Sequence, residues 1–136
     1  MIEGACHCGA VRWTFDGDPA RDTVTTCNCS WCRRTGGLWV YDYEGERITL
    51  AGPTAAYVRR DMDDPPFLEN LFCPVCAGVV AWRALAPDAE GRRRMAVNVR
   101  HADPAAIGDF ALRHFDGLDR FEDLPVTGQC VRDVLF

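Results

Sequence analysis

The sequence contains a compact cysteine motif, Cys73-Pro74-Val75-Cys76-Ala77-Gly78, which has the form of a zinc knuckle. In a knuckle, a tight turn points two thiolates at one ion while backbone amides donate hydrogen bonds to the sulfurs. A second pair of thiols lies in Cys6-His7-Cys8 near the N-terminus. Cys6 and Cys8 are two residues apart, so on a regular strand both side chains face the same side. The two pairs together predict a closed four-cysteine site, which is structural because a saturated zinc ion has no position for substrate.

A third cluster, Cys27-Asn28-Cys29-Ser30-Trp31-Cys32, offers three thiolates within six residues. Three protein ligands leave one coordination position open, which is the mark of a reactive zinc ion. We therefore expect two zinc ions per chain, one structural and one reactive. The spacing also permits an alternative, in which Cys29 and Cys32 join the pair Cys73 and Cys76 in one four-cysteine site.

Two arginines, Arg33 and Arg34, follow Cys32 directly and precede Gly36-Gly37. This position would place guanidinium groups beside the open zinc ion. Guanidinium groups suit the carboxylates of an acidic substrate, so we expect the two arginines to bind substrate. The alternative is a pair of solvated surface arginines.

The cysteine clusters also allow interpretations without catalysis. All seven clustered cysteines could serve structure alone, because zinc sites in small domains are more often scaffolds than catalysts. A redox dithiol at Cys73 and Cys76 is a weaker alternative, since no βαβ pattern surrounds it. Cys130 stands alone, and we expect it to be a small buried hydrophobic residue. We assign no chemistry to the histidines, which are His7, His101 and His114.

Short β-strand patterns surround the cysteines. The run from Ala10 to Phe15 alternates apolar and polar residues, and turn residues follow it. Two further runs, Leu38 to Tyr43 and Arg47 to Leu50, flank Glu44-Gly45-Glu46 and predict a hairpin. Other strand candidates are Ala55 to Arg59, Phe67 to Phe72, Val79 to Leu85 and Arg94 to Val99. Strands at this spacing predict a small, mainly β domain of the sandwich or barrel type.

Helical signals are scarce. The segment from Ser30 to Thr35 predicts one turn after an N-cap at Asn28 or Ser30, and Asp103-Pro104 marks a second helix start. The tail from Asp116 to Phe136 predicts an irregular segment lying on the sheet. No repeat and no linker divides the chain, so we expect a single domain over residues 1–136.

The composition excludes several function classes. The chain has 136 residues, 48% hydrophobic and 26% charged, as expected of one soluble globular domain. No charge-free run approaches the roughly 20 residues of a membrane-spanning helix. The first residues lack the features of a signal peptide, so we expect a cytoplasmic protein whose eight cysteines are reduced. A net charge of −5 argues against nucleic-acid binding, and the absence of lysine excludes a lysine nucleophile.

The three motifs, taken in order, resemble the family of glutathione-dependent formaldehyde-activating enzymes and centromere protein V. They are Gly4-x-Cys6-x-Cys8-Gly9-x-Val11-x-Trp13, Cys27-x-Cys29-Ser30-x-Cys32-Arg33-Arg34-x-x-Gly37 and Phe72-Cys73-x-x-Cys76. The resemblance extends from Gly4 to about Phe121, with a looser match at His114-Phe115-Asp116-Gly117. One departure is Ala77, which stands where the family commonly has glycine after the knuckle; it should alter the turn but not the ligands.

The resemblance implies a β-tent type of fold, made of antiparallel sheets with zinc at one end. It implies a structural zinc ion on Cys6, Cys8, Cys73 and Cys76, and an activity-linked zinc ion on Cys27, Cys29 and Cys32. The implied activity is that of a carbon-sulfur lyase, which joins formaldehyde and glutathione to S-hydroxymethylglutathione or reverses that reaction. The implied partner is thus a small-molecule thiol. The rivals are a non-catalytic zinc module that binds a protein, and a thiol- or aldehyde-binding protein without turnover.

Overall fold

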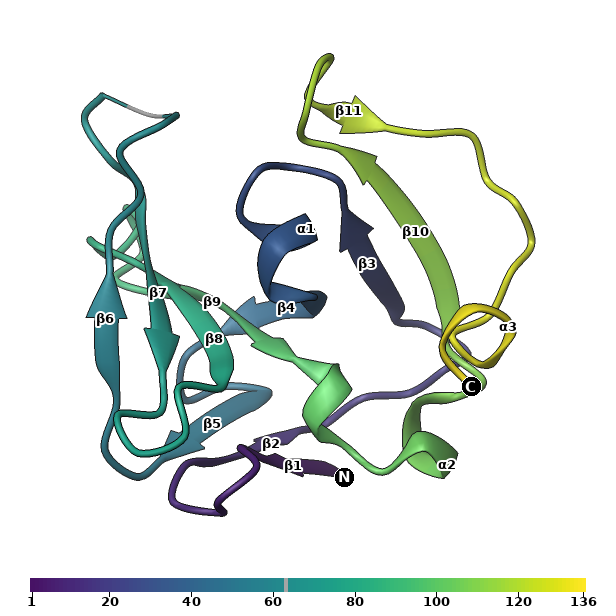
Figure 1. Ribbon diagram of the computed structural model, residues 1–136, viewed down its shortest axis with the longest axis horizontal. Coiled ribbons are helices and arrows are strands. Elements are labelled where there is room, and N and C mark those ends of the chain that lie inside the picture. Colours follow the sequence, from purple (N-terminus) through teal and green to yellow (C-terminus); the bar gives the residue numbers. More distant parts are fainter. Residues whose placement is uncertain (63) are drawn as a thin grey trace.

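The computed structural model describes residues 1–62 and 64–136, whose strands form two sheets (Figure 1). The smaller sheet is antiparallel and has the order β1 (Ile2–Ala5), β2 (Arg12–Phe15), β5 (Ile48–Ala51). The larger sheet has the order β11 (Glu122–Asp123), β10 (Ala111–Asp116), β3 (Thr23–Cys27), β4 (Leu38–Tyr43), β9 (Arg94–Asn98), β8 (Val79–Ala84), β7 (Leu68–Phe72), β6 (Ala55–Tyr57). The helices are α1 (Cys32–Thr35), α2 (Pro104–Ile107), α3 (Arg132–Leu135) and a 3₁₀ turn at Val99–His101. The expected mainly β fold is confirmed.

The core is one apolar cluster to which both sheets contribute. From the smaller sheet come Trp13, Phe15 and Ile48, each at most 1% exposed. The larger sheet contributes Leu38 and Met95 among others. The alternation in β2 explains this arrangement, because Trp13 and Phe15 are buried whereas Arg12 and Thr14 are not. This shared core packs the two sheets against each other.

The predicted hairpin between Leu38–Tyr43 and Arg47–Leu50 is wrong. Strand β4 pairs with β3 and β9, whereas β5 pairs with β2 in the other sheet. Arg47 anchors the connection by donating to the Asp16 carbonyl oxygen at 2.7 Å and the Asp22 carboxylate at 2.5 Å. The chain therefore crosses between the sheets here, and Ile48 is buried in the core instead of pairing back onto β4.

The other strand predictions match β2, β6, β7, β8 and β9, and each observed strand is one or two residues shorter than predicted. Strands β1, β3, β10 and the two-residue β11 are absent from the predictions. Among them, β10 runs parallel to β3, with Phe115 opposite Cys27. That pairing sets the end of β10 beside the middle cysteine cluster, a long-range placement that no local pattern signals.

The helix predictions have mixed outcomes. Asp103 caps α2 as expected, because its carboxylate accepts from the backbone N–H of Ala105 at 2.8 Å. The expected cap of α1 is wrong: Trp31 occupies the N-cap position, with no side-chain cap. The tail, expected to be irregular, contains the short elements β11 and α3, and its Val131 is fully buried. Cys130, expected to be buried, is only half-buried. Among the described residues, the helices are too short to cross a bilayer.

Candidate metal sites and the adjoining cavity

The structure brings the sulfurs of Cys6, Cys8, Cys73 and Cys76 within 4.8 Å of one another. The Sγ of Cys8 lies 3.6 Å from the Sγ of Cys6 and 3.6 Å from that of Cys73. These distances exceed the roughly 2.05 Å of a disulfide. They approach the edge of about 3.8 Å that a tetrahedron with zinc–sulfur bonds of about 2.3 Å requires. The donor set and its spacing thus fit a closed zinc site.

Turns, and not a strand, present these thiols. Strand β1 ends at Ala5, so Cys6 and Cys8 lie in the following turn, which closes when the Gly9 N–H donates to the Cys6 carbonyl oxygen at 2.8 Å. The expected placement of both cysteines on a strand is wrong. In the knuckle, the Ala77 N–H donates to the Cys73 carbonyl oxygen at 2.9 Å, and Ala77 has φ +61°. The turn thus keeps the left-handed conformation that glycine would favour.

Within this group, hydrogen bonds stabilise negative charge on the sulfur of Cys6. The backbone N–H of Val11 donates to the Sγ of Cys6 at 3.3 Å. Burial raises the pKa of Cys6, but this amide and the neighbouring thiols outweigh it and bring the pKa to about 6. Thiolate is the form that binds a metal ion. Cys6 is thus a thiol of this group that these hydrogen bonds favour as a ligand, whereas at Cys8 the backbone N–H of Ala10 is outweighed by burial and the thiol neighbours, which raise the pKa of Cys8.

The second group consists of Cys27 at the end of β3, Cys29 in the following loop and Cys32 at the start of α1, with sulfurs also within 4.8 Å of one another. The alternative pairing of Cys29 and Cys32 with the knuckle does not occur. Each sulfur accepts from an N–H: Cys27 from the Cys29 amide at 3.4 Å, Cys29 from the Cys32 amide at 3.4 Å, and Cys32 from the Trp39 indole at 3.3 Å. The thiols of Cys27 and Cys32 lower the pKa of Cys29, although burial acts in the other direction. Within the described ranges no histidine or carboxylate joins the three, so this set fits a three-ligand site.

A buried carboxylate braces the triplet loop. Asp116, 5% exposed at the end of β10, accepts from the Asn28 amide at 3.1 Å, and Asn28 in turn accepts from the Leu118 N–H at 2.9 Å. The backbone N–H of Asp119 and the Asn28 amide lower the pKa of Asp116. The brace sets Gly117 against the triplet, where an added Cβ would lie 2.6 Å from the Sγ of Cys27.

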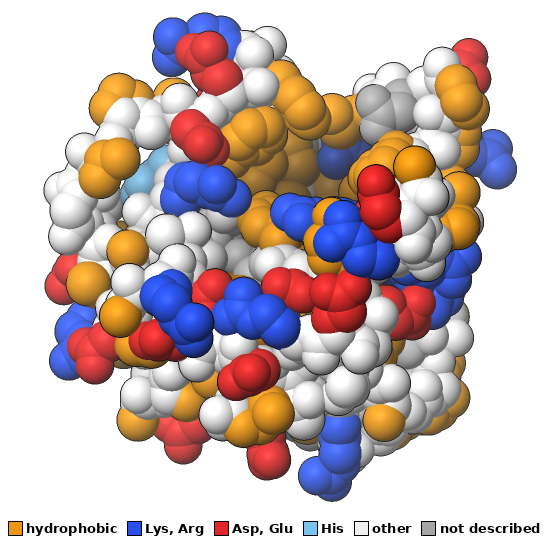
Figure 2. All heavy atoms as spheres, turned by 180° about the vertical axis from the view of Figure 1, so that it is seen from behind, with side chains coloured by type: hydrophobic (Ala, Val, Ile, Leu, Met, Phe, Trp, Pro, Cys, Tyr) orange, Lys and Arg blue, Asp and Glu red, His pale blue; other side chains and the backbone are white. Residues whose placement is uncertain are grey.

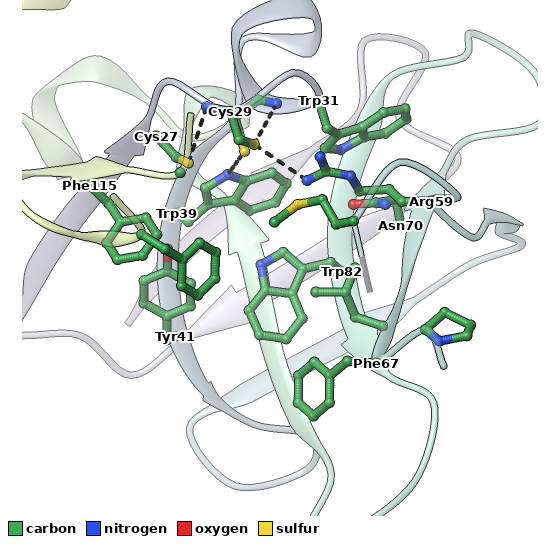
Figure 3. A pocket seen from close by; sticks show the side chains of 16 residues that line it. Cys27, Cys29, Trp31, Trp39, Tyr41, Arg59, Phe67, Asn70, Trp82 and Phe115 are labelled. Atoms are coloured by element: carbon green, nitrogen blue, oxygen red, sulfur yellow. Dashed lines mark hydrogen bonds between the residues drawn. The ribbon is translucent and has the colours of Figure 1, made fainter. Parts of the chain in front are cut away.

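A cavity of about 260 Å³ opens beside the triplet, and all three cysteines line it. Figure 2 shows a hollow lined by hydrophobic side chains between two raised parts of the surface. Close by, the cavity is walled by aromatic rings (Figure 3). Prominent among them are Trp31, Trp39, Tyr41, Phe67, Trp82 and Phe115.

Arg59 is a cavity residue that the sequence analysis missed. Its guanidinium donates to the Sγ of Cys29 at 3.4 Å and to the Asp61 carboxylate at 3.0 Å. Ser30 donates to the same carboxylate. The Arg59 guanidinium, with Ser30, holds the pKa of Asp61 well below its usual range. Because Arg59 follows β6 and is far from the cysteines in sequence, only its expected position at a strand end could have drawn attention to it.

The two arginines after Cys32 lie in different surroundings. Arg33 lines a second hollow, of about 310 Å³, together with Arg100 and His114. This hollow adjoins the aromatic cavity, since Cys27 and Cys32 line both. Arg34 is exposed and donates to the Ser30 carbonyl oxygen at 2.7 Å, back onto its own turn. Of the two, the structure sets only Arg33 beside the triplet.

Comparisons with known proteins agree with this architecture. A protein of Halomonas elongata named "Putative glutathione-dependent formaldehyde-activating enzyme" is 34% identical over 88 residues, covering 59% of this chain and 54%, about half, of the relative. A crystal structure of a Rhodobacter sphaeroides protein has a TM-score of 0.54 at 20% identity, covers 81% of this chain and 98% of that chain, and supports the fold. The family model described as "Glutathione-dependent formaldehyde-activating enzyme" matches residues 1–106. This chain therefore belongs to the glutathione-dependent formaldehyde-activating enzyme family.

Proposed function

We propose that the protein is a zinc-dependent carbon-sulfur lyase, which forms or cleaves the adduct of a glutathione-type thiol with an aldehyde, as in S-hydroxymethylglutathione. The observation that carries the proposal is the cysteine triplet, whose three sulfurs line a cavity. A three-thiolate site keeps one position open for a reactant. Family membership supports the thiol and aldehyde as reactants.

The two cysteine groups have different tasks in this proposal. Cys6, Cys8, Cys73 and Cys76 hold a structural zinc ion, and Cys27, Cys29 and Cys32 hold the second one. When bound at the triplet, zinc supplies Lewis acidity and stabilises a thiolate at neutral pH. The chain's part is to keep the ligands in place: the Trp39 indole and the Arg59 guanidinium each donate to a ligand sulfur. Hydrogen bonds from residues around a metal site orient the ligands and reduce the negative charge on their sulfurs.

The thiol substrate requires recognition of its carboxylates. Arg33 and Arg100 line the hollow beside the triplet, and neither has a carboxylate within salt-bridge distance among the described residues. A free guanidinium binds a carboxylate through paired, charge-assisted hydrogen bonds. We therefore propose Arg33 as a substrate-binding residue, with Arg100 beside it. We do not propose this part for Arg34, because its guanidinium donates to the Ser30 carbonyl oxygen and does not line this hollow.

The rival function, a zinc module that binds a protein partner, predicts that a fourth ligand closes the second site. The described residues bring no fourth cysteine, histidine or carboxylate to the triplet group. An open site in a cavity favours an enzyme. A scavenger without turnover would share the same geometry, and only kinetics separates it from a lyase.

The proposal is tested on zinc-loaded protein. Exchange spectroscopy by NMR measures how fast formaldehyde moves between its free form and its glutathione adduct. We expect the protein to accelerate this exchange and the Cys29→Ser variant to lose the acceleration while remaining folded. Titration calorimetry in parallel measures glutathione binding, which Arg33→Ala should weaken by about 1.5 to 3 kcal/mol if the pair is shielded from water, and by less if it is solvated. Binding without acceleration would identify a scavenger, and no binding would favour the protein-binding module.

A further inference from the structure

The aromatic cavity is larger and less polar than formaldehyde requires. Its volume is about 260 Å³, whereas an apolar cavity of about 150 Å³ already accepts benzene. The carbonyl carbon of formaldehyde carries only hydrogens. If formaldehyde were the aldehyde, no group on the carbon side of the adduct would fill the part of the cavity that Trp82 and Phe67 line (Figure 3).

The charged and amide groups at the cavity already have partners inside the protein. Arg59 is paired with Asp61 at 3.0 Å and also bonds the sulfur of Cys29. The buried Asn70 amide donates to the Tyr57 carbonyl oxygen at 3.4 Å. A substrate carboxylate placed here would lose its hydration without gaining a free cation. An uncharged apolar group has no strongly bound hydration to lose, and burying its surface is favourable.

Among the described residues, Arg33 and Arg100, which have no carboxylate within salt-bridge distance, line the adjoining hollow, and this hollow shares Cys27 and Cys32 with the aromatic cavity. The surroundings of the triplet are thus divided into a basic part and an aromatic part. An adduct with carboxylates on its sulfur side and an apolar group on its carbon side matches both.

We propose that the aromatic cavity binds an uncharged apolar group, of at least the size of a phenyl ring, carried on the aldehyde carbon of the adduct. This inference rests on the proposed lyase function. In the reaction, the thiol sulfur forms a bond to the carbonyl carbon and the thiol proton passes to the carbonyl oxygen, giving a hemithioacetal; the reverse step breaks the same C–S bond. No electrons are transferred to or from another reactant.

Stable thioethers test the binding preference without turnover. In S-benzylglutathione the benzylic carbon stands where the aldehyde carbon would be, and S-methylglutathione has the same charges without the ring. Calorimetric titration of zinc-loaded protein should show S-benzylglutathione binding about tenfold to a hundredfold more tightly, the effect of burying one aromatic ring. Equal affinities would overturn the proposal.

Two matched phenylalanines control for general effects of substitution. Phe67, 55% exposed, lines the cavity, whereas Phe136, 65% exposed, lies at the C-terminus outside it. Phe67→Ser should reduce the benzyl preference several-fold and leave S-methylglutathione unaffected, while Phe136→Ser should change neither. Arg33→Ala should weaken both thioethers equally and keep their ratio. A benzyl preference that survives Phe67→Ser unchanged would also overturn the proposal.

Two further measurements make two distinctions. One shows whether the apolar group belongs to the aldehyde or to the thiol, and the other tests the apolar binding site separately from the lyase function. Phenylmethanethiol carries the ring on the thiol, and 2-mercaptoethanol is the comparison thiol without a ring. If the protein binds phenylmethanethiol more tightly than 2-mercaptoethanol but does not prefer S-benzylglutathione to S-methylglutathione, the assignment of the apolar group to the aldehyde is refuted. Exchange NMR with glutathione and benzaldehyde should show acceleration greater than with formaldehyde. No acceleration with any aldehyde, alongside an intact benzyl preference, would refute the lyase function and still support the apolar binding site.

Discussion

Replacing Gly117 by alanine should empty the triplet metal site without unfolding the protein. Gly117 does not have a left-handed φ, so an alanine there has no backbone strain. Its Cβ, however, would lie 2.6 Å from the Sγ of Cys27 and 2.9 Å from the Cβ of Cys29. Ordinary contacts between such atoms are about 3.5 Å or longer, so one side must move by about 1 Å.

The turn at Gly117 is tied to the triplet loop through Asn28, so the turn cannot move away from the cysteines as a unit. Asn28 accepts from the Leu118 N–H at 2.9 Å and donates to Asp116 at 3.1 Å, which anchors the turn on both sides of Gly117. The cysteines therefore absorb most of the displacement. A zinc–sulfur distance tolerates only about 0.2 Å of error, so a shift of about 1 Å should lower the affinity of the triplet for zinc by at least tenfold to a hundredfold.

The assay is elemental analysis after dialysis against graded chelator, combined with thermal melting. We expect Gly117→Ala to retain one zinc ion per chain under conditions where the unsubstituted protein retains two, with a melting temperature close to that of the unsubstituted protein stripped at the triplet. Gly91→Ala is the control for metal content, because no atom lies within 4 Å of a Cβ at that position and both ions should stay bound. Its φ of +78° strains an alanine there, so a lower melting temperature is expected of this control while its zinc content stays at two. If Gly117→Ala keeps both ions with unchanged affinity, the reasoning about the brace and the triplet is refuted.

Three other predictions concern stability. Cys73→Ser should lower the melting temperature far more than Cys29→Ser, because a structural zinc site contributes folding free energy, on the order of 10 kcal/mol in small zinc peptides; equal melting temperatures in calorimetry would contradict the division between the sites. Ala77→Gly should raise the free energy of unfolding by about 0.5 to 1 kcal/mol in urea titrations, since Ala77 has φ +61° and glycine adopts that conformation without strain; a less stable variant would disprove this. Burial raises the pKa of Tyr41 to about 12. The folded chain thus keeps this proton after the unfolded chain releases it near pH 10, and stability should fall from about pH 10 to pH 12 with a slope that Tyr41→Phe lacks; an identical slope in denaturation of both proteins would argue against it.

The fold was predictable in class but not in pairing. Alternation of apolar and polar residues is local, so the strand at Arg12–Phe15 and the mainly β class follow from neighbouring residues. The separation of β4 from β5 does not, because it depends on Ile48 entering a core shared by both sheets and on Arg47 reaching the distant Asp22. A short turn between two β-rich runs is compatible both with a hairpin and with a connection between two sheets, so the local sequence does not distinguish them.

The sequence by itself determined the donor atoms of the two candidate metal sites. Sulfur ligands spaced two or three residues apart are brought close by any tight turn, so the pairs at Cys6 and Cys73 and the triplet at Cys27 could be identified without knowing whether the backbone was strand or turn. The family motifs, which are local patterns as well, led to the family that the matched residues 1–106 establish.

Only the tertiary structure decided what surrounds those sulfurs. Arg59, Trp82 and Phe115 come from segments far apart in the chain, and each sequence context is ordinary by itself. Their convergence on the triplet results from long-range strand pairing, such as Phe115 opposite Cys27, and from the brace at Asp116. The aromatic cavity, and with it the preference that we propose for an apolar substrate group, is therefore a property of the packed sheets, because its walls exist only when strands distant in sequence lie side by side.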